Sequence, residues 1–77
     1  MNNLDKQFPV SPEMKVIEEM GELTQAICKA ERFGWFNYHP DKGEHDSNIF
    51  AVKKEIADVR DALKQLERKW QMQEVGE

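Results

Sequence analysis

Four acidic side chains form two matched pairs in this 77-residue chain. Glu19 and Glu22 are three residues apart, and so are Glu55 and Asp58. Residues with this spacing project from the same side of an α-helix, so the two carboxylates of each pair can share one cation. Carboxylate oxygens are the ligands that hard divalent cations such as Mg²⁺ prefer. Each pair is therefore a candidate half of a metal site.

The segments around the two pairs resemble each other. Residues 19–27 (EMGELTQAI) and 55–63 (EIADVRDAL) align as acid, apolar, small, acid, apolar, two polar residues, Ala and apolar. At about 100° per residue, Glu19 and Glu55 each lie roughly 60° from the centre of an apolar stripe. The acids should therefore lie at the edge of a buried seam, and the small Ala of each segment leaves room beside them.

A first helix is expected over residues 12–33. Ser11 is a favoured N-cap residue, Pro12 suits the first helical position, and the acidic Glu13 complements the helix dipole. Apolar residues then recur at alternating steps of four and three, which places them on one face of a helix. These residues are Val16, Met20, Leu23, Ile27 and Ala30. The helix should end near Gly34.

A second helix is expected over residues 48–70. Its apolar residues follow a heptad pattern without a break. They are Ile49, Val52, Ile56, Val59, Leu63, Leu66 and Trp70. Ser47 or Asp46 can cap its start. Residues 34–47 are rich in Gly, Pro, Asp and Asn, which is typical of a loop, and residues 71–77 should fray as a tail.

These patterns predict an all-α fold, an antiparallel helical hairpin in a single domain of residues 1–77, with residues 1–10 as an N-terminal arm. Glu22 precedes the end of the first helix by 11 residues and Asp58 follows the start of the second by 10, roughly 16 and 15 Å along the axes. The four carboxylates can therefore converge. Because a chain this short builds only a marginal core, we expect a homodimer or homotetramer that completes a four-helix bundle.

The composition excludes several classes of function. A net charge of −4 and a pI near 5.2 argue against binding a nucleic-acid polymer, which needs clustered Lys and Arg. We expect no membrane partner, because no apolar stretch approaches the ~20 residues that cross a bilayer. Cys28 is the single cysteine and the start of the chain lacks a secretory pattern, so we expect a cytoplasmic protein.

Other kinds of metal site fit the acids less well than Mg²⁺ or Mn²⁺ does. Zinc would favour Cys or His ligands, and a di-iron site would need Glu-x-x-His pairs, but His39 and His45 both fall in the loop. An EF-hand over residues 41–49 lacks the required ligand spacing. The alternative is that the acids are solvated surface charges. Two matched pairs beside an apolar seam favour the metal site, because clustered carboxylates repel one another without a cation.

The acidic pattern resembles a known enzyme family. Glu18, Glu19 and Glu22 followed by Glu55 and Asp58 are similar to the EExxE and ExxD motifs of the MazG-like all-α nucleoside triphosphate pyrophosphohydrolases, in particular short phage-type members. The resemblance implies Mg²⁺-dependent cleavage of a nucleoside triphosphate to a monophosphate and pyrophosphate. It also implies that the last four of these acids bind Mg²⁺ while Glu18 assists, through a second metal or by orienting water.

Cationic and aromatic side chains are weaker candidates for binding the substrate. Trp35, together with Phe36 and Tyr38, could stack on a nucleobase or instead plug the end of the hairpin. Several cations on the helices could reach phosphates, although such residues are commonly solvated. They are Lys53 and Lys54, with Lys29, Arg32 and Arg60.

Two other functions compete with the enzyme. The heptad seam of the second helix could belong to a non-enzymatic interaction module, with the acids only solubilising its rim. The chain could also be a degenerate relative that binds metal or nucleotide without turnover.

Overall fold

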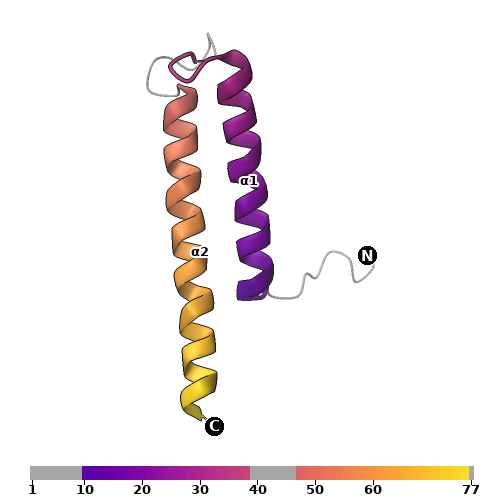
Figure 1. The fold of residues 1–77 in the computed structure, drawn as a ribbon, viewed down its shortest axis with the longest axis vertical. Coiled ribbons are helices and arrows are strands. Elements are labelled where there is room, and N and C mark those ends of the chain that lie inside the picture. Colours follow the sequence, from indigo (N-terminus) through magenta and orange to yellow (C-terminus); the bar gives the residue numbers. More distant parts are fainter. Residues whose placement is uncertain (1–9, 39–46, 77) are drawn as a thin grey trace, which may run out of the picture.

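The computed structural model describes residues 10–38 and 47–76, which form two helices and no strand. The first, α1, comprises Pro12–Phe33, and the second, α2, comprises Asn48–Gly76. They lie side by side and antiparallel (Figure 1). The predicted all-α hairpin is therefore confirmed for the described residues. The N-terminal arm up to residue 9, the loop residues 39–46 and the cap candidate Asp46 lie outside them.

The start of α1 is held by the N-cap that the sequence predicts. Ser11 has extended backbone angles, and its hydroxyl accepts a hydrogen bond from the Met14 N–H at 3.1 Å. Its carbonyl accepts the first helical bond from Lys15 N–H at 2.8 Å. Pro12 and Glu13 follow in the first turn. This arrangement satisfies donors that the first turn of a helix otherwise leaves unpaired.

A glycine ends α1. Gly34 donates its N–H to the Ala30 carbonyl at 2.8 Å and adopts φ +98°, which side chains rarely allow. The Asn37 side chain then donates to the Phe33 carbonyl and occupies the space beside Gly34. The chain can leave the helix sharply here because residue 34 has no Cβ.

The turn is tied directly to the start of α2. Asn48 donates its side-chain amide to the Gly34 carbonyl and its backbone N–H to the Asn37 carbonyl, both at 2.8 Å. Ile49 N–H donates to the Trp35 carbonyl at 2.7 Å. These bonds join the end of one helix to the beginning of the other, so they set the register in which the helices pack.

The second helix is longer than the sequence predicted. The expected end was Trp70 with a fraying tail, whereas α2 continues to Gly76. Lys69 contacts both carboxylate oxygens of Glu13 at 2.9 Å, which places it level with the start of α1. The turns after Lys69 therefore project beyond α1 (Figure 1). Nothing between Trp70 and Gly76 breaks a helix, and the Gln, Met and Glu residues there favour one.

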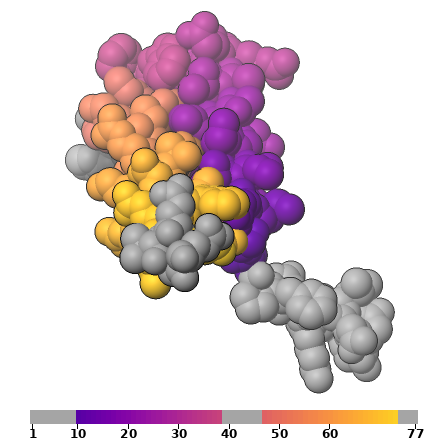
Figure 2. All heavy atoms as spheres, turned by 60° about the horizontal axis from the view of Figure 1, so that its bottom comes forward, coloured from indigo at the N-terminus to yellow at the C-terminus, as the bar shows by residue number. Residues whose placement is uncertain are grey.

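The core between the helices is thin. Its buried apolar residues in the described part of the chain are Val16, Ala30, Val52 and Ala62. Other members of the predicted apolar seams are more exposed than expected, among them Met20, Ile27, Leu63 and Trp70. One helix can cover only one side of its neighbour, and in Figure 2 the atoms of α1 lie beside those of α2, with much of each helix at the surface. Ile17 and Phe50, which belong to neither predicted seam, are also exposed.

A helix that spans a bilayer must be long and apolar. Neither α1 nor α2 is apolar enough over a sufficient length to span a membrane.

Gly21 and Gly34 should respond to alanine with opposite signs. Gly34→Ala would place a Cβ 2.6 Å from the Asn37 side-chain nitrogen at a positive φ, and should destabilise the hairpin by about 1–3 kcal/mol. Gly21→Ala meets nothing within 4 Å and should stabilise α1 by roughly 0.5–1 kcal/mol. Thermal unfolding of both variants measures the contrast. Equal effects would contradict this account of the turn.

Candidate metal centre

Three of the four predicted ligands come together between the helices. Glu19 of α1 and Glu55 and Asp58 of α2 each place one carboxylate oxygen within 4.8 Å of the other two. We call these three residues the acidic triad. Its members come from facing helices, so the hairpin must close before the triad exists. A single divalent cation can contact several oxygens at this separation.

Burial distinguishes this cluster from ordinary surface acids. Glu19 is only 7% exposed. Its Oε2 and the Oε2 of Glu55 are both buried and have no hydrogen-bond partner among the described residues. A buried polar atom without a partner costs about 1–3 kcal/mol, and more when it carries charge. Two such oxygens, one from each helix, are the donor set that a hard cation would satisfy.

Two lysines already neutralise the outer side of the triad. Lys15 Nζ lies 3.0 Å from Glu19 Oε1, while Lys54 Nζ lies 3.0 Å from Asp58 Oδ2 and 3.5 Å from Glu55 Oε1. Hydrogen bonding to Glu19 raises the pKa of Lys15, and hydrogen bonding to Asp58 raises that of Lys54. Both lysines are exposed, so they can move aside at little cost. Their contacts leave the two buried oxygens unsatisfied.

The fourth predicted ligand, Glu22, lies at the edge of the triad. Its side chain is exposed and is not one of the three that converge. Repulsion from Glu19, and then from Glu55, raises the pKa of the Glu22 carboxyl above its usual 4.5. The electrostatic field of the triad therefore reaches Glu22. A flexible Glu at this place can turn toward a bound cation.

The remaining predicted site residues occupy different places. Glu18 is exposed on α1, next to Glu19 in sequence but outside the triad. Lys54 contacts the triad, whereas the Lys53 amine lies 5.7 Å from the centre of the Phe50 ring. Lys15 is not among the residues predicted from the sequence, although its i, i+4 spacing from Glu19 is the usual sign of a helical ion pair.

The aromatic residues after α1 lie away from the carboxylates. Trp35 is 13 residues beyond Glu22, about 20 Å along the axis, and its indole N–H donates to Glu31 Oε2 at 2.7 Å. Phe36 is 77% exposed, so it does not plug the end of the hairpin in the single chain. Trp35 therefore serves the local turn, and the structure does not bring it to the triad.

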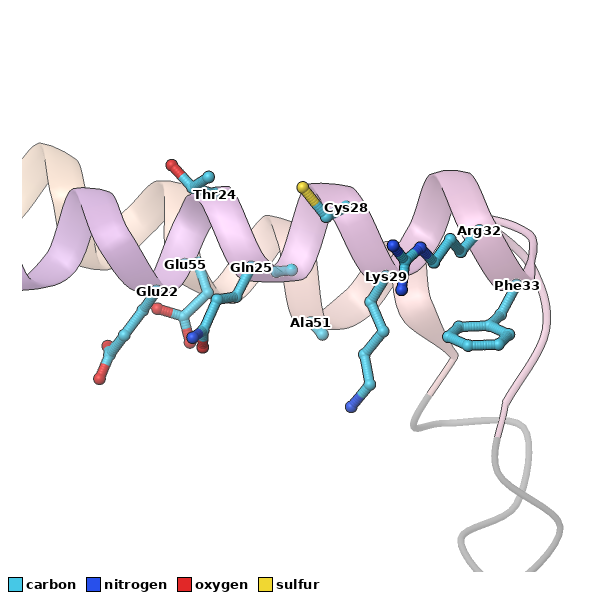
Figure 3. A pocket seen from close by; sticks show the side chains of 10 residues that line it. Glu22, Thr24, Gln25, Cys28, Lys29, Arg32, Phe33, Ala51 and Glu55 are labelled. Carbon is cyan, nitrogen blue, oxygen red and sulfur yellow. The ribbon is translucent and has the colours of Figure 1, made fainter.

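A groove of about 610 Å³ runs beside the triad along α1 (Figure 3). Ala26 and Ala51 are among the small side chains that line it. The predicted space next to the acids is therefore present on the Ala26 side. The corresponding Ala62 of α2 is only 2% exposed and fills the contact between the helices instead.

Comparison of the chain with family models, with curated proteins and with solved structures gives no match. The sequence pattern and the geometry of the triad and its groove are therefore the guides to function.

The raised pKa of Glu22 predicts a pH-dependent difference between the wild type and Glu22→Gln without metal. An acid whose pKa is higher in the folded state destabilises the fold above that pKa, and the effect disappears below the unfolded value of 4.5. Glu22→Gln should therefore melt higher than the wild type at pH 7, and the gap should close as the pH falls below 4.5.

Thermal melts in a chelating buffer measure this gap. Glu67→Gln, which removes an exposed acid elsewhere on α2, is the matched control for net charge. A gap of the same size for both variants at pH 7 would show that Glu22 feels only the overall charge.

Proposed function

We propose that this chain is a Mg²⁺-dependent nucleoside triphosphate pyrophosphohydrolase whose metal is held by Glu19, Glu55 and Asp58, with Glu22 as a further ligand. One observation carries the proposal: Glu19 and Glu55, on facing helices, each have a buried carboxylate oxygen without a hydrogen-bond partner among the described residues, and a third acid, Asp58, lies beside them. An all-oxygen donor set of this kind suits Mg²⁺ or Mn²⁺. The reaction is taken from the resemblance of the acidic pattern to the MazG-like enzymes.

The charge of the protein fits this chemistry. With a net charge of −4 and an acidic triad, the bare site would repel a triphosphate. A bound divalent cation would reverse that repulsion, polarise a phosphoryl oxygen and lower the pKa of a water molecule. Glu18 is exposed beside Glu19, where it can orient the attacking water from the solvent side. We place the reaction in the cytoplasm.

The exposed apolar residues support assembly as a second part of the proposal. Ile17 is 63% exposed, and Met20, Ile27 and Phe50 are also uncovered in the single chain. Two hairpins that packed these faces together would form a four-helix bundle. A homodimer, or a homotetramer built from it, would also add walls to a groove that one hairpin leaves open.

The interaction-module alternative has one observation in its favour. The ion pairs of Lys15 with Glu19 and of Lys54 with Asp58 are typical of solvated helix surfaces. They do not account for the two buried oxygens, which such a surface would leave in water. Measuring metal binding and turnover distinguishes the alternatives. An interaction module with solvated acids predicts neither, a degenerate relative predicts metal binding alone, and the enzyme predicts both.

Removing one ligand charge should abolish turnover. Glu19→Gln and Glu55→Gln keep the size of the side chain but delete a charge, so each should lower the rate by far more than tenfold with helical content unchanged. Lys64→Ala, an exposed change outside the triad, is the control. The measurement is product analysis with Mg²⁺ and a panel of nucleoside triphosphates. Release of phosphate with a diphosphate would contradict the proposed reaction, and near-normal rates in either variant would refute the ligand assignment.

Metal should stabilise the fold without any substrate. A cation that binds only the folded protein adds RT ln(1 + [L]/Kd), about 1.4 kcal/mol at tenfold over Kd. In a domain this small the melting temperature should rise by roughly 5–10 °C. Mg²⁺ and Mn²⁺ should both act, and NaCl at equal ionic strength should do much less, because screening does not reproduce coordination.

The ligand variants provide the control for this shift. Glu19→Gln and Asp58→Asn should lose the response to metal, yet melt at or above the metal-free wild type because each removes a repelling charge. Equal shifts with Mg²⁺ and NaCl, together with an unchanged response in the variants, would favour the interaction module over the enzyme.

A further inference from the structure

The groove beside the triad changes character along its length. Glu22 and Glu55 line the end next to the triad, and Lys29, Arg32 and Phe33 line the end next to the turn. In Figure 3 the Glu22 carboxylate and the Lys29 amine extend to the same side of α1, as expected for residues seven apart, about 10 Å along the axis. The groove therefore joins a candidate cation site to a pair of basic side chains.

The two basic residues differ from three lysines elsewhere on the hairpin that form ion pairs. Lys15 and Lys54 are paired with the triad, and Lys69 is paired with Glu13. Within the described residues, neither Lys29 nor Arg32 forms an ion pair with an acid. Both side chains are exposed where they line the groove, at the end farthest from the triad, so an anion there can reach their charges.

We propose that Lys29 and Arg32 bind the β- and γ-phosphates of the substrate, so that the pyrophosphate half lies toward the turn and the α-phosphate lies at the triad. This inference rests on the proposed function and assigns the direction in which the substrate binds. Its basis is the continuous groove that carries carboxylates at one end and the basic side chains of Lys29 and Arg32 at the other.

Charge decides between the two possible directions. The pyrophosphate half carries most of the negative charge, whereas the nucleoside half is neutral. In the opposite direction, the neutral nucleoside would face Lys29 and Arg32. The pyrophosphate half would then lie away from these cations, on a protein whose net charge is negative. Arg32 can also bind phosphate through two parallel hydrogen bonds.

The same contacts would assist the bond cleavage. In the proposed reaction a water oxygen bonds to the α-phosphorus, and the bond from that phosphorus to the bridging oxygen breaks. Both electrons of the broken bond leave with pyrophosphate, and the proton of the water passes to solvent. Negative charge therefore grows on the leaving group, where fixed cations stabilise it. A diphosphate lacks one of the two bound phosphates, so a triphosphate should be preferred.

Inorganic pyrophosphate tests the inference directly, because it represents only the half that Lys29 and Arg32 would bind. Calorimetric titration in excess Mg²⁺ should show Lys29→Gln and Arg32→Gln each weakening its binding about tenfold or more. Lys64→Gln, an exposed basic residue outside the groove, should leave it unchanged. Binding of a nucleoside triphosphate should weaken in parallel, whereas a nucleoside monophosphate should bind all variants equally.

The outcomes separate the inference from the function on which it rests. Circular dichroism and the Mg²⁺-dependent melting shift should be unchanged in both variants, since neither residue belongs to the triad. If the wild type and the variants bind Mg²⁺ alike but pyrophosphate affinity stays within twofold, the inference is wrong and the metal site stands. A larger loss for the monophosphate than for pyrophosphate would reverse the direction. Absence of Mg²⁺ binding in the wild type would instead overturn the proposed function.

Discussion

The hairpin must accommodate carboxylates that face each other across its own packing interface. Among the described residues, Glu19 and Glu55 each contribute a buried oxygen without a hydrogen-bond partner, and few buried apolar residues are present to offset the cost. The helices cannot separate there without also exposing Val16, Val52 and Ala62, so packing holds the acids together against their repulsion. This opposition between packing and charge is what makes the triad a candidate site rather than a surface feature.

The charged side chains around the acidic triad are distributed unevenly. Lys15 and Lys54 engage the outer oxygens of the triad from exposed positions, and the inner oxygens remain unsatisfied. Glu22 responds to the same field through its raised pKa. Lys29 and Arg32 lie farther along the groove. Carboxylates from both helices, which could hold a cation, thus lie at one end of the groove, and basic groups of α1, which could hold an anion, lie at the other.

The thin core has consequences for assembly as well as for the site. Two helices can bury only the line along which they touch, so apolar side chains on their outer faces, such as Ile17 and Phe50, stay exposed. A helical pair of this size usually needs further burial to be stable. The proposed four-helix bundle would supply that burial and would also enclose the groove. The same assembly would then both stabilise the fold and complete the proposed site.

Local sequence determined the elements, because capping and apolar periodicity act within a few residues. Ser11 and Pro12 marked the start of α1, Gly34 marked its end, and the matched acid pairs identified three residues that converge. The heptad pattern ended at Trp70, but α2 continues to Gly76 because the residues between them favour a helix. Only the tertiary structure decided which oxygens are buried, that Glu22 stays outside the triad, and that Ala62 is packed while Ala26 borders a groove. Those outcomes depend on the rotation and register of one helix against the other, which the turn hydrogen bonds of Asn48 and Ile49 and the side-chain packing set together.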